Sequence, residues 1–375
     1  MSMVFKLTKI DLSLVPGYSG VRLDKKISPL EYRIYQHYRL AHGLRISLAF
    51  VLTFLIVRLL ALPEGTWPLI TLVVVMGPIS FWGNVLQRAL QRIAGTVFGA
   101  ASGLIALRLE LFSLPVMLAW CGLVMFICGY LTLGKRPYMA LLIGITLAVV
   151  CGAGAGDMRT ALWRSGDVVI GSLLALLFTS IYPQRAFIHW RMQMRFSLLA
   201  ISKIYAAYIS PNVIERPRLE GRLKTVLNDV VKIRALLTPA SKETGLPKPV
   251  MESIQTLSRN MVCVLELQIE AWWASRESHF LLLNATSLRH TQIRTLRTLA
   301  TLAEALREGN PEPIVANSEE LASIAAELHQ MRESINQRHQ IEAPIYGYVW
   351  LSLKLAQQLE ELAQLLCIAL RRPMP

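Results

Sequence analysis

Long apolar runs, separated by short polar stretches, occupy the chain between residues 44 and 182. A helix needs about 20 mainly apolar residues to cross a membrane, and six segments meet or nearly meet that length. These segments are residues 44–62, 67–82, 93–107, 114–133, 138–155 and 161–182. The second and third are short, so we expect their helices to extend into the polar flanks. The pattern predicts a bundle of six transmembrane helices.

Beyond residue 185, charged residues recur every few positions and apolar residues follow helical spacing. Two such series are Leu219, Leu223, Val226, Val230, Ile233 and Leu237, and Leu351, Leu355, Leu359, Leu362 and Leu366. The second series suggests a seventh span, but Lys354 and Glu361 would be costly at the centre of a bilayer. The breakers that divide this half into about five helices are Pro211, Pro239 with Gly245-Leu246-Pro247, Gly309-Asn310-Pro311 and Pro344. We therefore expect an all-α protein in which the six-span membrane bundle is followed by a cytosolic helical bundle.

The region before the first apolar run contains the breaker sequence 15–20 and then a helix-start motif. Ser28, Pro29 and Glu31 form a capping box, which satisfies the first backbone amides of a helix. This motif predicts a helix over residues 29–44, whose amphipathic, aromatic and basic character favours the membrane interface. The chain then divides into an N-terminal cytoplasmic arm and helix (1–43), a membrane domain (44–182) and a cytoplasmic helical domain (183–375).

The net charge of +14 is compatible with nucleic-acid binding, but the Lys and Arg residues form no stripe with interleaved aromatic residues. They concentrate in the N-terminal arm and in alternate connections between the predicted spans. Those in the connections are Arg88, Arg92, Lys135, Arg136, Arg185, Arg191 and Arg195. Because cytoplasmic loops carry an excess of Lys and Arg, we expect a multi-pass protein with both termini inside, and no nucleic-acid partner.

Two of the predicted spans share a short motif. The sequence from Arg92 to Gly99 (R-x2-G-x3-G) recurs from Arg164 to Gly171 as R-x2-D-x3-G. The offset of about 70 residues corresponds to three spans, and an odd number of spans inverts the second copy, as in many transporters. A chance match accounts for so few residues equally well.

Glycine and proline mark contact and kink positions within the spans. Gly95, Gly99 and Gly103 repeat every four residues on one face of the third span, a spacing that lets another helix approach closely. We interpret this face as a helix-packing surface, within the chain or between subunits. Gly77 and Pro78 interrupt the second span, where they produce either a structural kink or a broken helix beside a transport path.

The charged candidates for an anion pathway are Arg58, Arg92, Arg164 and Asp167. Arg164 and Asp167 lie three residues apart on one helical face, and they form either an anion or proton site or an ion pair at the interface. Arg58, near the outer end of the first span, is also interpretable as a side chain that reaches out to water. Arg92, at the inner end of the third span, is either a topology determinant or an anion contact.

The sequence contains no motif of a known catalytic site: no Walker lysine motif, no G-x-S-x-G and no H-E-x-x-H. The five cysteines form no CxxC pair, and no histidine is spaced with them as a metal ligand. The glycine-rich sequence 151–157 follows an apolar span rather than a strand, so it does not fit a dinucleotide-binding loop. We expect neither enzymatic activity nor a metal or cofactor.

Seven stretches along the chain carry a family resemblance. They are Ser28–Arg33, Thr66–Ile70, Met76–Asn84, Ala161–Asp167, Tyr182–Trp190, Pro239–Thr244 and Pro344–Leu351. In these stretches, which together extend over nearly the whole chain, the sequence resembles the YeeA-type inner-membrane proteins of bacteria. Those proteins belong to the fusaric-acid-resistance and aromatic-acid-exporter superfamily.

The resemblance implies a bacterial inner-membrane protein connected with the efflux of aromatic carboxylic acids. A distant branch, the plant aluminium-activated malate transporters, forms dimeric anion channels with six spans and a cytosolic helical domain. Long exporters of the superfamily carry two membrane halves in one chain and this chain carries one, which implies a homodimer. We expect a transporter or channel for small organic anions, drawn in by basic side chains. The alternative is a membrane-anchored interaction or envelope-maintenance protein without transport activity.

Overall fold

The computed structural model describes the backbone of residues 27–62, 65–77, 81–134, 136–152, 158–181, 184–210, 215–274, 282–283, 285–337 and 343–371. These residues form fourteen helices, and a single bridge between Phe81 and Gln184 is the one strand-like pairing among them. The prediction of an all-α protein is therefore confirmed. The chain forms two compact units, which are described separately. Among the described residues, the apolar unit lies within Ser28–Trp190 with Thr238–Glu243, and the bundle unit lies within Arg191–Leu237 and Thr244–Pro375.

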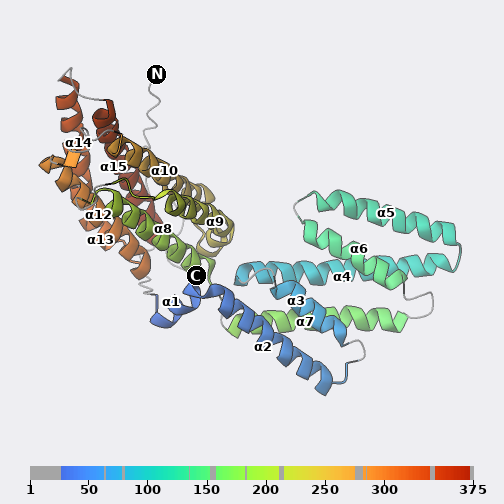
Figure 1. The fold of residues 1–375 in the computed structure, drawn as a ribbon. Helices are drawn as coiled ribbons and strands as arrows, with labels where there is room; N and C mark the ends of the chain where they lie inside the picture. Colours follow the sequence, from blue (N-terminus) through green and yellow to red (C-terminus); the bar gives the residue numbers. More distant parts are fainter. Residues whose placement is uncertain are drawn as a thin grey trace. The chain divides into compact units, whose positions relative to one another are not determined.

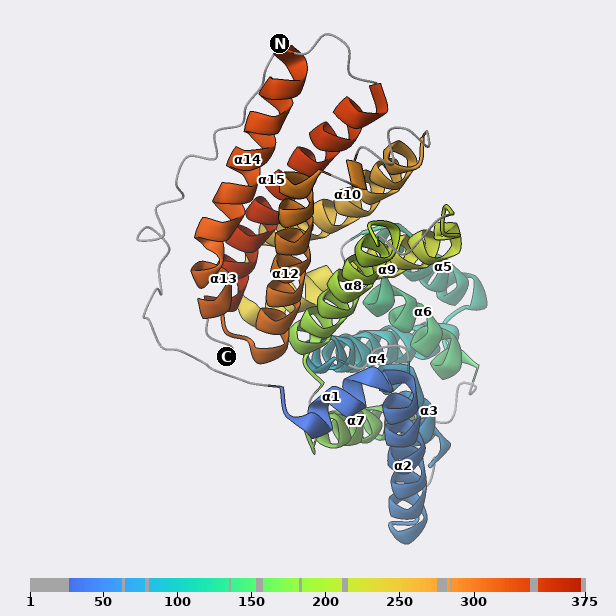
Figure 2. The same ribbon diagram turned by 60° about the vertical axis from the view of Figure 1, so that its left-hand side comes forward.

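The apolar unit contains the first seven helices (Figures 1 and 2). They are α1 (Pro29–Gln36), α2 (Tyr38–Leu59), α3 (Thr66–Met76), α4 (Trp82–Glu110), α5 (Leu114–Thr132), α6 (Pro137–Cys151) and α7 (Met158–Ile181). Three stretches are long and apolar enough to cross a membrane: α2, residues Val85–Glu110 of α4, and α5. The other apolar helices, including residues Gly166–Ile181 of α7, are shorter. Each of the helices α2 to α7 thus covers most of one predicted apolar segment.

The two segments that we expected to extend behave differently. The helix of the third segment, α4, begins at Trp82 and so runs well into the polar flank, as predicted. The helix of the second segment, α3, ends at Met76, and the next helix starts five residues after Gly77. Helix α3 therefore ends where the sequence predicted a kink or a broken helix, although Pro78 itself lies outside the described residues.

The capping box predicted at Ser28 is present. The Ser28 hydroxyl accepts from the Glu31 amide at 3.1 Å, and the Glu31 carboxylate accepts from the Ser28 amide at 3.0 Å. The predicted helix over residues 29–44 is wrong in its second half, because α1 ends at Gln36 and α2 begins at Tyr38. His37, between them, has φ −107° and ψ 40°, outside the helical region. No glycine or proline marks this break in the sequence.

Close glycine contacts hold the helices of the apolar unit together. A Cβ added to Gly99 of α4 would lie 2.7 Å from the carbonyl oxygen of Ile143 and 2.6 Å from Cβ of Thr146, both on α6. Gly95 and Gly103 meet α6 in the same way, so this face of α4 is covered within the chain. Small residues at such a crossing let two backbones pack closely in an apolar environment.

The second copy of the short motif makes a corresponding contact. A Cβ added to Gly171 of α7 would lie 2.6 Å from the carbonyl oxygen of Pro68 and 2.9 Å from Cβ of Thr71, both on α3. In each copy, therefore, the glycine meets a backbone carbonyl and a threonine one turn further along the partner helix. The packing of the helices also matches between the two copies. The third helix of each copy packs on the second helix of the other (α4 on α6, α7 on α3), and the first helix packs on the second within each copy (α2 on α3, α5 on α6). The two third helices, α4 and α7, pack on each other. Figure 1 shows α4 between the α5–α6 hairpin and the group of α2, α3 and α7.

The remaining helices belong wholly or mainly to the bundle unit. They are α8 (Ala186–Tyr208), α9 (Glu220–Thr244), α10 (Lys248–Trp272), α12 (Thr286–Glu308), α13 (Glu312–Ala316), α14 (Ser318–Gln337) and α15 (Ala343–Arg371). The prediction of about five helices is too low, because the described residues form seven. The break predicted at Pro239 with Gly245-Leu246-Pro247 occurs at the second part of that group: α9 continues through Pro239 and ends at Thr244, and the next residue, Gly245, has a left-handed φ of +64°.

The apolar series read from the sequence form the core of the bundle unit. Every leucine, valine and isoleucine in the two series is buried, and α15 packs on α10 and α14. Buried polar groups lie within this core: the Tyr348 hydroxyl accepts from Gln292 at 2.9 Å and meets the Tyr208 hydroxyl at 3.4 Å. Burial raises the pKa of both phenols above the ordinary value, so both stay protonated and can donate.

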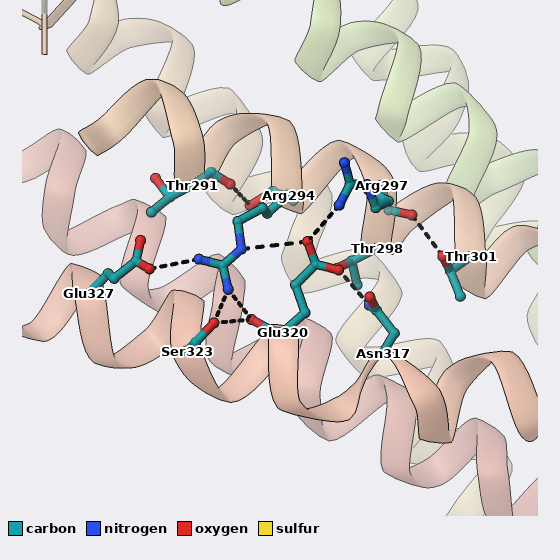
Figure 3. A network of polar contacts seen from close by, with 10 residues as sticks. Thr291, Arg294, Arg297, Thr298, Thr301, Asn317, Glu320, Ser323 and Glu327 are labelled. Carbon is teal, nitrogen blue, oxygen red and sulfur yellow. Dashed lines mark hydrogen bonds and ion pairs between the residues drawn. The ribbon is translucent and has the colours of Figure 1, made fainter. Parts of the chain in front are cut away.

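A second polar network joins α12 to α14 on the side of the bundle unit (Figure 3). Arg294 of α12 donates to the carboxylate of Glu327 at 2.7 Å and to the backbone carbonyl of Glu320 at 3.1 Å, and it also contacts Ser323. Arg297, one turn further along α12, reaches the carboxylate of Glu320 at 3.2 Å. These contacts fix the register of α14 against α12.

Candidate anion site

The backbone carbonyl groups at the C-terminal end of α3 have no partner in a following helical turn, because the helix ends there. Basic side chains form hydrogen bonds to them. The Nε2 atom of His42, on α2, lies 3.0 Å from the carbonyl oxygen of Gly77. The guanidinium of Arg88, on α4, donates to the carbonyl of Val74 at 3.5 Å. Positive groups are favourable at this end of a helix, where the last carbonyls have no partner within the helix.

His42 also connects Arg45 to this helix end. A carbonyl oxygen can only accept, so Nε2 of His42 carries the proton toward Gly77. In the neutral ring Nδ1 is then an acceptor, and the Arg45 guanidinium lies 3.5 Å from it. Arg45 is half-buried on the first long apolar helix. The sequence reasoning missed both residues, although a histidine and an arginine three positions apart at the start of an apolar run were a visible signal.

Arg92 lies one turn beyond Arg88 on α4 and is almost completely buried, with 6% of its surface exposed. Its guanidinium is near Tyr138, the second residue of α6, and acts electrostatically on the phenol together with Arg88. The Arg88 guanidinium itself lies over the Tyr138 ring, 5.0 Å from the centroid. The apolar unit therefore places one buried arginine, Arg92, and one half-buried arginine, Arg88, beside one phenol.

Two polar atoms at this place have no partner of ordinary hydrogen-bond geometry among the described residues. They are the Nε atom of Arg92 and the hydroxyl oxygen of Tyr138, and both are buried; the hydroxyl interacts with the Arg92 guanidinium itself. A buried donor without a hydrogen-bond partner is unfavourable. An anion between Arg92 and Tyr138 would accept from both groups, because the guanidinium and the hydroxyl are donors. Arg92, Arg88 and Tyr138, with Arg45 and His42 nearby at the end of α3, form the candidate anion site.

The other predicted site residues lie toward the opposite end of α3. Asp167 is completely buried on α7, one turn before Gly171, which contacts Pro68 in the first turn of α3. Arg164 precedes it by three residues on the same helix, and its side chain lies outside the description. Arg58 is exposed near the end of α2, and 13 residues of helix, about 20 Å, separate it from Arg45. The four charged candidates are thus divided between two ends, with Arg92 alone in the candidate anion site.

Aromatic side chains close the apolar unit at the end where α8 begins. The His189 ring lies 4.6 Å from Tyr38 and 6.0 Å from Phe81, measured between ring centroids. Burial lowers the pKa of His189 to about 4, so the ring is neutral at physiological pH. The Tyr35 hydroxyl accepts from the Arg185 amide at 2.9 Å, which ties α1 to the start of α8. This cluster joins α1, α2, α4 and α8.

The comparisons with known proteins agree with this arrangement of apolar helices. A family model described as "Fusaric acid resistance protein-like" matches residues 51–178. The inner membrane protein YeeA of Escherichia coli (strain K12) is 58% identical over 352 residues, which cover 94% of this chain and 100% of that protein. The uncharacterized transporter YdhK of Salmonella typhimurium (strain LT2) is 25% identical over 324 residues, which cover 81% of this chain and 41% of the relative. The chain therefore belongs to the YeeA family of fusaric acid resistance protein-like membrane proteins.

Proposed function

We propose that this protein is an inner-membrane transporter or channel for the efflux of small organic anions such as aromatic carboxylates. The observation that carries the proposal is the buried guanidinium of Arg92, whose Nε atom lacks a hydrogen-bond partner among the described residues and which interacts with the hydroxyl of the neighbouring Tyr138. Arg88 adds a second positive charge at the same place. A site with buried donors and excess positive charge selects anions over cations and neutral molecules.

The proposed topology has six spans, with both termini and the helical bundle inside. Three described helices are long enough to cross, and α3, α6 and α7 cross with the help of flanking residues. The basic residues at alternate connections support the orientation. In this orientation Arg88, Arg92 and Tyr138 lie at the cytoplasmic end of the membrane helices, and Asp167 lies near their outer end. Two three-helix copies with matching contacts support an inverted repeat, an arrangement that transporters use for access from alternate sides.

We also propose that the protein acts as a homodimer. The chain matches only 41% of the length of the relative that is named a transporter, so one copy corresponds to part of that protein. Two copies together would supply two sets of six spans. The glycine face of α4 is covered by α6 within the chain, so the dimer contact would use another surface.

Flux through liposomes that contain the purified protein tests the proposal. We expect aromatic carboxylates to leave loaded vesicles faster than from empty liposomes, and Arg92→Met to abolish this difference. Arg108→Met is the matched control, because Arg108 is an exposed arginine on the same helix, away from the candidate anion site. Absence of flux for several acids, or equal flux with Arg92→Met, would overturn the proposal. A cellular phenotype that survives Arg92→Met but is lost on deletion of residues 183–375 would instead favour a membrane-anchored interaction protein.

A further inference from the structure

Two cysteines face each other across the α5–α6 contact. The Sγ atoms of Cys121, on α5, and Cys151, the last residue of α6, lie 4.0 Å apart. Both side chains are half-buried at the edge of an apolar cluster that also contains Cys128 and Leu147. The two residues come from different helices and are separated by a full hairpin, so their contact is made by the fold rather than by sequence proximity.

The separation suits a bond between the two sulfur atoms. A disulfide needs an S–S distance of about 2.05 Å, so the sulfurs must approach by about 2 Å. Rotation about the Cα–Cβ bonds moves a sulfur atom by such an amount, and neither cysteine is completely enclosed. Cys128, two turns along α5, is buried in the same cluster, whereas Cys263 and Cys367 belong to the bundle unit.

We propose that Cys121 and Cys151 are a reversible dithiol–disulfide pair that fastens α5 to α6. On oxidation each thiol loses one proton and one electron, and one S–S bond forms between the two sulfur atoms. A disulfide compound, such as oxidised glutathione or the disulfide of an oxidoreductase, takes up both electrons and both protons and is reduced to two thiols. In the proposed orientation Cys151 lies at the outer end of α6, toward a compartment in which disulfides form and persist.

The disulfide would act on the helix that carries part of the candidate anion site. Helix α6 bears Tyr138 at its other end and packs along the glycine face of α4, which carries Arg92. Fastening its outer end to α5 restricts movement of α6 against α5, and because α5 itself packs on α4, it also restricts movement of α6 against α4. We therefore expect the oxidised protein to pass anions more slowly than the reduced protein, a consequence that rests on the proposed function.

Thiol counting tests the pair without reference to transport. Membranes that contain the full-length protein are equilibrated with oxidised glutathione, trapped with acid, dissolved in SDS and treated with a maleimide-polymer that retards the protein for each free thiol. Of the five thiols, three should be labelled in the wild type, and all five after dithiothreitol. Cys121→Ser and Cys151→Ser should each leave every remaining thiol free. Cys128→Ser, the matched control, should still form the disulfide.

Labelling of all five wild-type thiols after oxidised glutathione would overturn the proposal, as would a disulfide that persists in Cys121→Ser. Flux is then compared in oxidised and reduced liposomes. Slower flux in the oxidised wild type, with no redox effect in Cys151→Ser, supports the link to transport. Absence of flux in both states, together with a disulfide found by labelling, would count against the proposed function and leave the disulfide pair established.

Discussion

The guanidinium of Arg191 fills the space beside Gly309 in which any other residue would place its Cβ atom. A Cβ added there would lie 2.7 Å from Nη2 and 2.9 Å from Nη1 of Arg191. The guanidinium is held in place because its Nε atom donates to the carbonyl of Leu306 at 2.9 Å and Nη2 donates to that of Arg307 at 3.1 Å. These carbonyls are at the C-terminal end of α12, where the helix offers them no partner. A residue that the sequence suggested as a topology signal thus caps a helix in the bundle core.

Replacement of Gly309 by alanine should destabilise the bundle unit. Its φ of +77° is in the left-handed region, which costs other residues about 1–2 kcal/mol. The added methyl group also displaces the Arg191 cap, so we expect the free energy of unfolding to fall by about 2–4 kcal/mol in total. Thermal unfolding in detergent, followed by tryptophan fluorescence, measures the change. The control is Gly221→Ala on α9, where nothing lies within 4 Å of the new atom; equal stability of the two variants would contradict the proposed cap.

The contact between α4 and α6 predicts opposite effects for two glycine-to-alanine changes in apolar helices. Gly99→Ala forces the new methyl group against backbone and Cβ atoms of α6, and overpacking of this kind costs about 1–3 kcal/mol. Gly122 of α5 has nothing within 4 Å, and alanine favours a helix over glycine by about 0.5–1 kcal/mol. We expect Gly99→Ala to lower the unfolding temperature in detergent and Gly122→Ala to keep or raise it. An equal fall in the unfolding temperature of both variants would show that the close approach of α6 to Gly99 does not determine the effect.

The sequence predicted the features that depend on local periodicity. The capping box at Ser28, the apolar segments and the buried leucine series of α15 follow from spacing alone, because helix geometry repeats every 3.6 residues. The breakers from Pro239 to Pro247 correctly indicated a helix end, which lies at Thr244, but α9 passes through Pro239 itself and loses one backbone hydrogen bond there.

The contacts that define the candidate site depend on residues far apart in the chain. His42 forms a hydrogen bond to the carbonyl of Gly77, 35 residues later in the chain, and Tyr138 lies 46 residues beyond Arg92. Arg191 reaches a helix end 115 residues later. Charge in the sequence indicated that Arg92 and Arg191 mattered, but one lies in the apolar unit beside a phenol and the other caps a helix. Periodicity carries no information on which helix end or which phenol a basic side chain meets.

Glu243 of α9 predicts a measurable pH dependence of stability. Its Oε2 atom accepts from the backbone amides of Ala186 and Phe187, at 2.6 and 3.2 Å, at the start of α8. Burial raises the pKa of this carboxyl above its ordinary value of 4.5, outweighing the amides and the nearby Arg185, which lower it. The folded protein therefore holds this proton more tightly than the unfolded chain. Its contribution to stability is complete below pH 4.5 and declines as pH rises through the higher folded-state pKa.

Replacement by glutamine removes this titration and keeps an oxygen that accepts from Ala186. We expect the stability of Glu243→Gln, relative to the wild type, to increase as the pH is raised from 4.5 to neutrality. Unfolding temperatures at several pH values in this interval measure the difference. Glu270→Gln, at an exposed position of α10, is the control. A relative stability of Glu243→Gln that stays level or falls with rising pH would show that the folded-state pKa is not raised.

The network between α12 and α14 should have a larger coupling energy than an exposed ion pair. Arg294 exposes 21% of its side chain and approaches Glu327 to 2.7 Å, whereas Lys232 and Asp229 on α9 expose 75% and 49% at a distance of 2.9 Å. Exposed pairs contribute about 0.2–1 kcal/mol, and partial burial with several hydrogen bonds raises this value. A double-mutant cycle with Arg294→Met and Glu327→Gln should give a coupling free energy of about 1–2 kcal/mol. The same cycle at Lys232 and Asp229 should give about 0.3 kcal/mol. Equal values would show that burial does not strengthen the network.

Removal of the Tyr138 hydroxyl should weaken anion binding without removing the site. Tyr138→Phe keeps the ring under the Arg88 guanidinium and deletes the hydroxyl that can donate to an anion beside Arg92. One such hydrogen bond contributes about 0.5–1.5 kcal/mol, so we expect the half-saturating anion concentration for flux to rise by about 2- to 10-fold. Tyr138→Ala, which also removes the ring, should have a larger effect. Tyr130→Phe on the exposed surface of α5 serves as the control. If Tyr138→Phe and Tyr130→Phe saturate at the same concentration as the wild type, the anion does not lie between Arg92 and Tyr138.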